Sequence, residues 1–449
     1  MKTLRRKLQE LAIKGDSLEF MRLLAQKRAA DHADDLAFLY VDGHVRVYSG
    51  QEDLPKAYVM QRRLAMPGTT DYWVNDKQGQ PLLVITAEAN EGLSKMLLPV
   101  LDEVRNAVGD RRLTVVFDRG GWNQKLFLSL IKEKNWDILT YRKGKTRNVS
   151  RKSFQERSVT IDGRKITYEV SERNVRFLKN KLKLRQVTVL GKHDHQTHIL
   201  TSRTDLDAPE VAYWLFNRWR QENYFNYMEE EFALDALATY DIELANPDRQ
   251  VPKPAWKAID KELRAAKAEV AKLEQKYGAA AVENEEADRP TMRGFKIANG
   301  RSIGRPLREA RKKVTELKDR RKAIPKRVPV SETKDEEQVP IRLRVATKRL
   351  GDTLKMVAYQ AESALVGLLR RHYRRTEDEG RTLIASTLQS AAELKVHPGE
   401  LRVTLAPLSS AHRSEAIKKL CAELNEMRVP FPGTNLILQF GVSEPNVWP

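Results

Sequence analysis

Two stretches decide the fold of this chain: FLYVDGH at residues 38–44 and LTVVFDRGG at residues 113–121. Each is an apolar run typical of a buried β-strand, and each carries one carboxylate, Asp42 in the first and Asp118 in the second. A carboxylate in a buried strand costs free energy unless its charge is compensated. Because hard cations such as Mg²⁺ and Mn²⁺ prefer carboxylate oxygens, the pattern makes Asp42 and Asp118 candidate metal ligands.

The elements around these stretches predict an α/β fold. Apolar periodicity and turn residues predict helices over 3–29, 92–108 and 123–133, and strands over 36–48, 58–64, 81–87, 112–117 and 138–141. The order of three strands, helix, strand, helix, strand is that of an RNase H-like core, a mixed sheet with flanking helices. In such a sheet the first strand lies beside the fourth, so we expect Asp42 to lie opposite Asp118.

The rest of the chain extends this core. A β-rich insertion is expected at about 150–203, followed by a helix over 209–232. Apolar residues three and four apart over 256–277 and 307–317 predict a helical hairpin with a loop at 278–304, and a long helix over 343–373 precedes a small α/β unit over 400–441. The expected domains are an N-terminal helix (1–30), a catalytic domain (31–240), a basic helical hairpin (241–335) and a C-terminal helix with the α/β unit (336–449).

The chain is strongly basic. It has 449 residues with 80 Lys or Arg and 61 Asp or Glu, a formal net charge of +19. The run 305–327 concentrates this charge, with 11 Lys or Arg against 3 acidic residues. Such a balance favours a polyanionic partner, because Lys and Arg release counterions from phosphates. A basic run on a helix is also often only a solvated face.

Cysteine content and hydropathy limit the other classes. The single cysteine, Cys421, excludes an internal disulfide and a cysteine-based zinc site, and its helical surroundings predict a small buried apolar side chain. No apolar stretch approaches the roughly 20 residues that a bilayer span needs. We therefore expect no membrane contact and a cytoplasmic location.

A third carboxylate, Glu222, lies on the predicted helix over 209–232. Together with Asp42 and Asp118 it would complete a set of carboxylates able to hold two metal ions about 4 Å apart. One ion would activate water or a 3′-hydroxyl, and the other would stabilise the leaving 3′-oxygen. Each residue also has a structural explanation: Asp42 in a hairpin tip, Asp118 as a helix cap, and Glu222 paired with Arg218 one helical turn away.

Four histidines are weaker candidates for a metal site. His193, His195 and His198 stand close together, but their place between two predicted strands favours an exposed turn. His44 lies two residues from Asp42 and so points to the same face of its strand. It could orient a ligand water or be an ordinary half-buried side chain.

These residues resemble those of DDE transposases of bacterial insertion sequences. The chain is most similar to the group with a β-rich insertion and a Tyr-x2-Arg-x3-Glu-x6-Lys signature. The sequence segments that carry the resemblance are VDGH (41–44), VFDRGGW (116–122), LTYRK (139–143), KMVAYQAE (355–362), and Arg218 with Glu222. They cover most of residues 31–240 and, less specifically, the C-terminal part.

The chain departs from the signature at two positions. The Tyr position is Leu215, where the nearby Tyr213 or Phe216 could substitute by a change of register. The Lys position is Glu229, and the missing Lys puts in doubt the usual contact to the transposon-end phosphate and weakens any expectation of a DNA hairpin intermediate. Only 41 residues precede Asp42, so a truncated or divergent copy is expected.

The resemblance implies metal-dependent cleavage at transposon ends and strand transfer into target double-stranded DNA by a homodimer on the bacterial nucleoid. It implies that Asp42, Asp118 and Glu222 hold Mg²⁺ or Mn²⁺, two ions in all. DNA-binding residues would be Arg218, Arg119, Arg142 and Lys143. Two alternatives stay open: an RNase H-like nuclease without strand transfer, such as a resolvase, and an inactive transposase remnant that only binds DNA.

Overall fold

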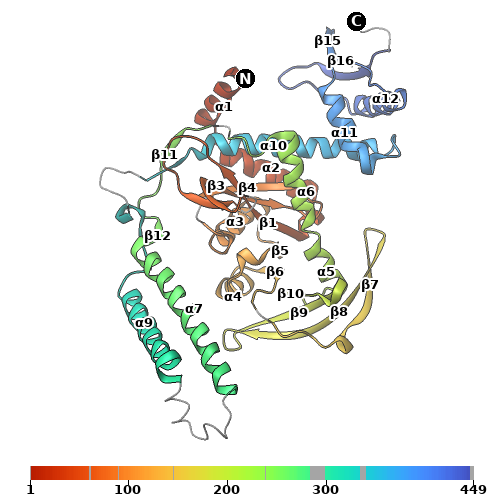
Figure 1. Cartoon of the computed structure of the whole chain (residues 1–449). Helices are drawn as coiled ribbons and strands as arrows, with labels where there is room; N and C mark the ends of the chain where they lie inside the picture. Colours follow the sequence, from red (N-terminus) through yellow and green to blue (C-terminus); the bar gives the residue numbers. More distant parts are fainter. Residues whose placement is uncertain are drawn as a thin grey trace. The chain divides into compact units, whose positions relative to one another are not determined.

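The computed structural model describes residues 2–59, 62–88, 91–144, 146–237, 239–283, 299–333 and 340–444. The chain divides into two compact units (Figure 1). The first consists of Met1–Tyr240 with Arg344–Pro449, and the second of Asp241–Leu343. Within the described residues, none of the helices combines the length and the apolar character needed to cross a bilayer.

A mixed sheet of ten strands, counted over the described residues, is the centre of the first unit. The strands are β1 (Phe38–Val47), β2 (Lys56–Val59), β3 (Leu64–Asn75), β4 (Pro81–Glu88), β5 (Leu113–Phe117), β6 (Trp136–Tyr141), β7 (Gln155–Ile161), β8 (Arg164–Phe177), β9 (Leu182–Leu190) and β10 (Gln196–Thr201). Their order is β2-β3-β1-β5-β6-β10-β9-β8-β7, with β4 paired to β3. β1 is antiparallel to β3 and parallel to β5, which is parallel to β6.

The predicted α/β class with a mixed sheet and flanking helices is confirmed. The strands expected as an insertion, β7 to β10, continue the same sheet beyond β6 (Figure 1). Each pairs antiparallel with the next, and β10 pairs with β6. These four strands therefore belong to the same hydrogen-bonded sheet as β6, the strand that follows Asp118 in the chain.

The helices of the first unit cover both faces of the sheet. They are α1 (Lys2–Lys14), α2 (Ser17–Asp31), α3 (Leu93–Val108), α4 (Gln124–Lys132), α5 (Ala208–Phe216), α6 (Trp219–Phe232), α10 (Val345–Leu369), α11 (Thr376–Gln389) and α12 (Ala411–Glu426). Side chains alternate along each strand. Val41 and Phe117 belong to the core with α3 and α4, whereas Tyr40 and Val116 belong to the core with α5.

Three sequence predictions for this unit were wrong in detail. The helix expected over 3–29 is two helices, because Asp16 caps α2 by accepting hydrogen bonds from the backbone N–H of Leu18 and Glu19. The helix expected over 209–232 breaks at Arg218, where backbone bonds reach three residues back instead of four. The strand expected over 58–64 ends at Val59, and β3 begins at Leu64 as a separate strand.

A buried network of four charges joins α10 to the sheet. Arg46 of β1 contacts Asp71 of β3 at 3.0 Å and Asp352 of α10 at 2.7 Å. Lys348 of α10 also contacts both carboxylates. Burial raises the pKa of Asp71, but Lys348 and Arg46 outweigh burial, so the net shift is downward. Two cations on two carboxylates make a balanced set that fixes α10 against β1 and β3.

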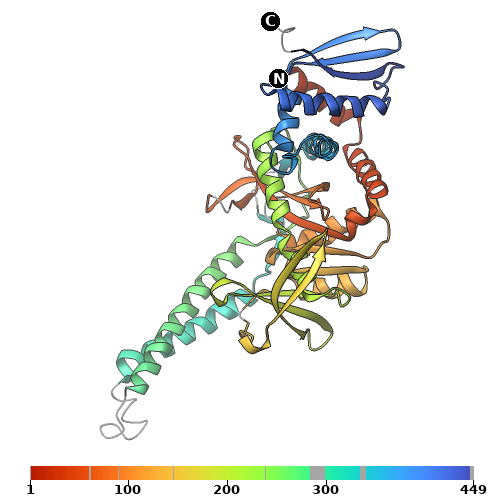
Figure 2. The same ribbon diagram turned by 90° about the vertical axis from the view of Figure 1, so that its right-hand side faces the viewer.

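The C-terminal part of the first unit ends in a three-stranded sheet of β15 (Ala392–His397), β16 (Glu400–Leu405) and β17 (Ile437–Val442). Helix α12 lies against it, and Figure 2 shows the helix beside the strands. β15 and α11 were absent from the prediction. Cys421 of α12 is 4 % exposed, which confirms the predicted small buried side chain, and burial raises the pKa of its thiol to about 11.

The second unit is built on a helical hairpin. Helices α7 (Pro254–Val282) and α9 (Arg305–Lys322) lie side by side in both views, as the two apolar seams predicted (Figure 2). Two short antiparallel pairs close the unit: β11 (Ile242–Leu244) with β14 (Ile341–Leu343), and β12 (Gln250–Pro252) with β13 (Arg327–Pro329). Helix α7 extends into the predicted loop, of which residues 284–298 lie outside the described residues.

Candidate active site

Asp42 lies within β1, and Asp118 directly follows the adjacent parallel strand β5. The last registered pair of β1 and β5 is Val41 with Phe117, so the next residues on the two strands are the two aspartates. They follow Tyr40 and Val116 in the alternation and therefore share one face of the sheet. Burial raises the pKa of Asp42, and the charge of Asp118 adds to this rise. Two carboxylates thus stand within electrostatic reach of each other, as the order of strands predicted.

Arg218 compensates this negative charge. Its Nη2 donates a 2.6 Å hydrogen bond to Asp42 Oδ2, and only 11 % of its side chain is exposed. Burial lowers the pKa of Arg218, but Asp42, Asp118, Tyr141 and Glu222 together raise it above its ordinary value. All three candidate carboxylates therefore lie in the field of one guanidinium group.

Helix α6 carries Glu222 along the strand that carries Asp42. Arg218, Glu222, Phe225 and Glu229 are spaced four, three and four residues apart, so they share one side of the helix. Arg218 contacts Asp42, the Phe225 ring stacks on His44 at 5.2 Å, and Glu229 lies 3.8 Å from His44. Glu222 therefore lies on the side of α6 that follows β1, between the contacts to Asp42 and His44.

The three carboxylates are near one another but not converged. They do not form a group whose ligand atoms all lie within 4.8 Å, although all three residues are described. Glu222 is exposed, while Asp42 and Asp118 are half-buried. Convergence of the three carboxylates on a shared ion would therefore require rotation of side chains.

The structural explanations of these residues differ in outcome. Asp42 is not in a hairpin tip, because β1 continues to Val47 and Asp42 pairs with Trp73 of β3. Asp118 does cap a short turn, since its Oδ1 accepts a 2.7 Å hydrogen bond from Gly120 N. Arg218 forms its ion pair with Asp42 rather than with Glu222.

Two neighbours of the site escaped the sequence analysis. Gly43 is not a turn glycine: a Cβ there would lie 2.9 Å from the ring of Tyr72, so the missing side chain admits that ring beside Asp42. Gln221 is buried at 1 % exposure and donates from Nε2 to Tyr40 O, Trp73 O and Asn75 Oδ1. Tyr72 lies on a strand that was not predicted, and Gln221 gave no local signal.

The comparison with known families decides the class of protein. A family described as "Transposase protein" matches residues 1–443. This chain belongs to that family. No curated protein matches the chain. The match covers both units. The second unit is therefore part of the transposase family's sequence, as is the sheet near Asp42 and Asp118.

A second group of potential metal ligands in the transposase consists of His44 from β1, Glu229 from α6 and Asp235 from the segment after α6. His44 Nε2 is 2.6 Å from Asp235 Oδ1 and 3.8 Å from Glu229 Oε1, and the ligand atoms of all three lie within 4.8 Å of one another. Glu229 occupies the position where the signature has Lys. The Glu229 carboxylate at this position therefore lies beside the His44 ring. A hydrogen bond from His44 to Asp235 explains the group without an ion.

The other residues expected at DNA lie around β6. Arg119 and Lys143 are exposed, and the Arg119 guanidinium lies 5.6 Å from the centre of the Tyr141 ring. Arg142 is half-buried, donates to Gln186 Oε1 and lies over the Phe177 ring at 5.6 Å. Arg119 and Lys143 are thus available to a ligand, whereas Arg142 is engaged within the protein.

The expected turn at His193 and His195 is exposed, and His198 Nδ1 lies 3.0 Å from Thr188 Oγ1. These histidines do not form a metal-binding group among the described residues. The interpretation as an exposed turn is confirmed for His193 and His195, which lie in and directly after the turn Lys192–Asp194, whereas it was wrong for His198, which is half-buried in β10.

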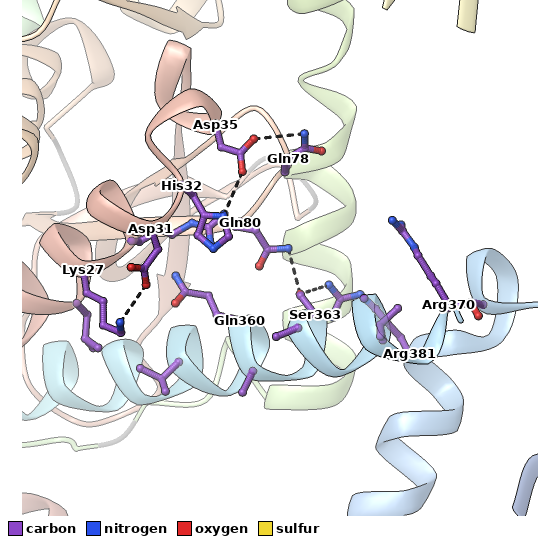
Figure 3. A pocket seen from close by; sticks show the side chains of 18 of the residues that line it. Lys27, Asp31, His32, Asp35, Gln78, Gln80, Gln360, Ser363, Arg370 and Arg381 are labelled. Carbon is purple, nitrogen blue, oxygen red and sulfur yellow. Dashed lines mark hydrogen bonds and ion pairs between the residues drawn. The ribbon is translucent and has the colours of Figure 1, made fainter. Parts of the chain in front are cut away.

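A cavity of about 900 Å³ lies away from the carboxylates of the transposase, between α2, α10 and α11 (Figure 3). Neither the aspartates nor Glu222 line it. Its polar groups pair with one another: Lys27 with Asp31 at 3.0 Å, Gln80 with Ser363 at 3.0 Å, and Arg381 with Ser363 (Figure 3). Gln80 Oε1 is buried and has no hydrogen-bond partner in the structure, but this one atom does not indicate a particular ligand.

Proposed function

We propose that this transposase is of the DDE type and that Asp42, Asp118 and Glu222 hold divalent metal ions, Mg²⁺ or Mn²⁺ and two in number. On this proposal the first unit contains an RNase H-like catalytic core. The observation that carries the proposal is the adjacency of Asp42, within β1, and Asp118, directly after the parallel strand β5, with Glu222 on α6 one turn beyond Arg218, which contacts Asp42.

The donor set suits such ions. Carboxylate oxygens are the ligands that Mg²⁺ and Mn²⁺ prefer. The pKa of Asp42 is raised by burial first and then by Asp118, which means that added positive charge would stabilise the ionised pair. In this structure Arg218 supplies that positive charge.

When bound, the ions would polarise the scissile phosphate and stabilise the attacking and leaving oxygens. The residues of the chain would position the carboxylates and the DNA. Asp42 and Asp118 are held by the sheet, and Arg218 orients the Asp42 carboxylate through its 2.6 Å hydrogen bond. Arg119 and Lys143 are exposed beside them and would hold the DNA phosphates flanking the cut.

The proposed substrates are the ends of the transposon and a target duplex, and the proposed active form is a homodimer acting on the bacterial nucleoid. The support for these points is the resemblance to DDE transposases together with the membership of the family. Cleavage followed by strand transfer requires a donor end and a target in the same reaction, unlike simple cleavage.

The first test is nicking of a supercoiled plasmid that carries the ends of the element, with Mg²⁺ or Mn²⁺. Asp118→Asn should reduce the rate by about 100-fold or more, because losing a metal ligand removes several kcal/mol of charge stabilisation. Asparagine keeps the oxygen that accepts from Gly120 N, so the local turn should survive. The matched control is Asp110→Asn, an exposed aspartate outside the site.

Different outcomes separate the alternatives. Nicking that Asp118→Asn abolishes and Asp110→Asn preserves would support the catalytic assignment. A joined product between end oligonucleotides and the plasmid would then separate a transposase from a nuclease without strand transfer. If the wild type shows no metal-dependent nicking but binds DNA, the proposal fails and the protein is a binding remnant.

A further inference from the structure

The helical hairpin of the second unit buries an apolar seam and exposes basic side chains. Ile259, Leu263 and Ala266 of α7 pack against Val314 and Leu317 of α9. Helix α9 contains nine Lys or Arg and three acidic residues, and most of them are exposed. At 1.5 Å per residue, its 18 residues give a positively charged line roughly 27 Å long.

One end of this line contains a pocket. A cavity of about 660 Å³ is lined by Trp256 from α7 and by the residues Lys318, Asp319, Arg321, Lys322, Ile324 and Lys326. The Arg321 guanidinium lies 5.5 Å from the centre of the Trp256 ring, and the Lys326 ammonium lies 5.3 Å from it. Four cations, one aromatic ring and a single carboxylate, Asp319, therefore line the pocket.

The four cations are not equally engaged. Arg321 forms a 2.5 Å ion pair with Asp260, which also holds Arg264. Among the described residues, the ammonium groups of Lys318, Lys322 and Lys326 form no ion pair in the structure, and all three side chains are exposed. Arg321 thus fixes the wall of the pocket, while the three lysines retain uncompensated charge.

We propose that this pocket binds phosphate groups of a DNA backbone, so that the hairpin is a DNA-binding arm of the transposase. A nucleic acid fits better than a compact acidic peptide, because basic side chains continue beyond the pocket along α9 to Arg305, although Arg305, Arg311 and Lys312 form ion pairs. Lysines beside an aromatic ring recognise phosphates as point charges and tolerate any base sequence. The inference rests on the proposed function only in taking DNA as the partner.

The test is the salt dependence of DNA binding by the full chain, measured without divalent metal. A labelled duplex of arbitrary sequence is titrated by fluorescence anisotropy between about 50 and 200 mM salt, and log Kd is plotted against log salt concentration. The triple variant Lys318→Gln, Lys322→Gln, Lys326→Gln should lower the slope by about 2.7, or roughly 0.9 for each lost phosphate contact.

Two further variants make the result specific. The triple variant Lys261→Gln, Lys267→Gln, Lys272→Gln removes the same charge from exposed positions of α7, and it should change the slope by less than about 1. Replacing Lys318, Lys322 and Lys326 by Arg should restore the wild-type slope, because the charge returns. Circular dichroism is used to verify that each variant is folded.

An unchanged slope in the pocket variant would overturn the inference. So would an equal loss in the α7 variant, since the binding would then belong to the basic surface in general. Because no metal is present, the result is independent of nicking. If the wild type does not nick DNA but the pocket variant lowers the salt slope, the proposed catalysis is refuted and the inference of a DNA-binding arm is retained.

Discussion

At the scale of single residues, Gln221 joins the candidate active site to the sheet. Its Nε2 donates to Tyr40 O on β1, Trp73 O on β3 and the Asn75 side chain, at 2.9 to 3.2 Å. It immediately precedes Glu222, so these hydrogen bonds fix where α6 starts its course along β1. Gln221 is thus a positioning residue that acts through the helix and does not itself need to touch DNA.

Replacing Gln221 tests this role. Gln221→Leu keeps the size of the side chain but removes the donor from three buried acceptors, so the free energy of unfolding should fall by about 1–3 kcal/mol. Urea denaturation measures the loss. Gln389→Leu, at an exposed position of α11, should change the free energy by less than about 0.5 kcal/mol. Equal stability of the Gln221→Leu variant and the wild type would contradict the role.

At the scale of elements, α10 is fixed to the sheet by charge. Lys348 contacts Asp71 and Asp352 and donates to Thr86 Oγ1 at 3.1 Å, while Arg46 contacts the same two carboxylates. Breaking a buried ion pair by removing one partner leaves an uncompensated charge in a medium of low dielectric constant. The network therefore makes the contact of α10 with β1 and β3 specific.

Lys348→Met should lower the free energy of unfolding by about 3–5 kcal/mol, because Asp71 and Asp352 would then share Arg46 alone. The matched control is Lys14→Met, which removes an exposed ion pair with Glu10 and should cost at most about 1 kcal/mol. The shift of the urea midpoint measures both. A loss for Lys348→Met as small as that for Lys14→Met would show that the network does not stabilise the fold.

At the scale of the whole molecule, the two ends of the second unit lie side by side. β11 and β14 are its first and last strands, and Ile242 pairs with Leu343 in antiparallel register. Paired Cα atoms in such a ladder lie about 5 Å apart. The two ends of the 241–343 segment are therefore close enough to be joined by a few residues.

Replacing residues 241–343 by a short Gly-Ser linker should leave the first unit folded. Such a variant should keep a cooperative thermal transition by circular dichroism, because both of its large cores lie outside the removed segment. It should also lose most of the salt-dependent DNA affinity that we assign to α9. Aggregation or a non-cooperative transition would mean that the first unit needs the second in order to fold.

The α/β class, the adjacency of β1 and β5 and the apolar seams of α7 and α9 could all be predicted from the sequence. These features follow from local periodicity and from the order of elements, which leave few topologies open. Local patterns also sufficed for the buried Cys421. They did not reveal β3, because its Asp71 is buried only by virtue of Arg46 and Lys348.

The contacts between residues far apart in the chain could not be predicted in this way. Arg218 pairs with Asp42 across 176 residues of chain, and Arg46 pairs with Asp352 across 306. A helix pattern fixes which residues share a face, but not which strand lies under that face. The position of Glu222 beside β1, the ring of Tyr72 over Gly43 and the pocket at Trp256 all depend on such long-range packing, which no single stretch of sequence encodes.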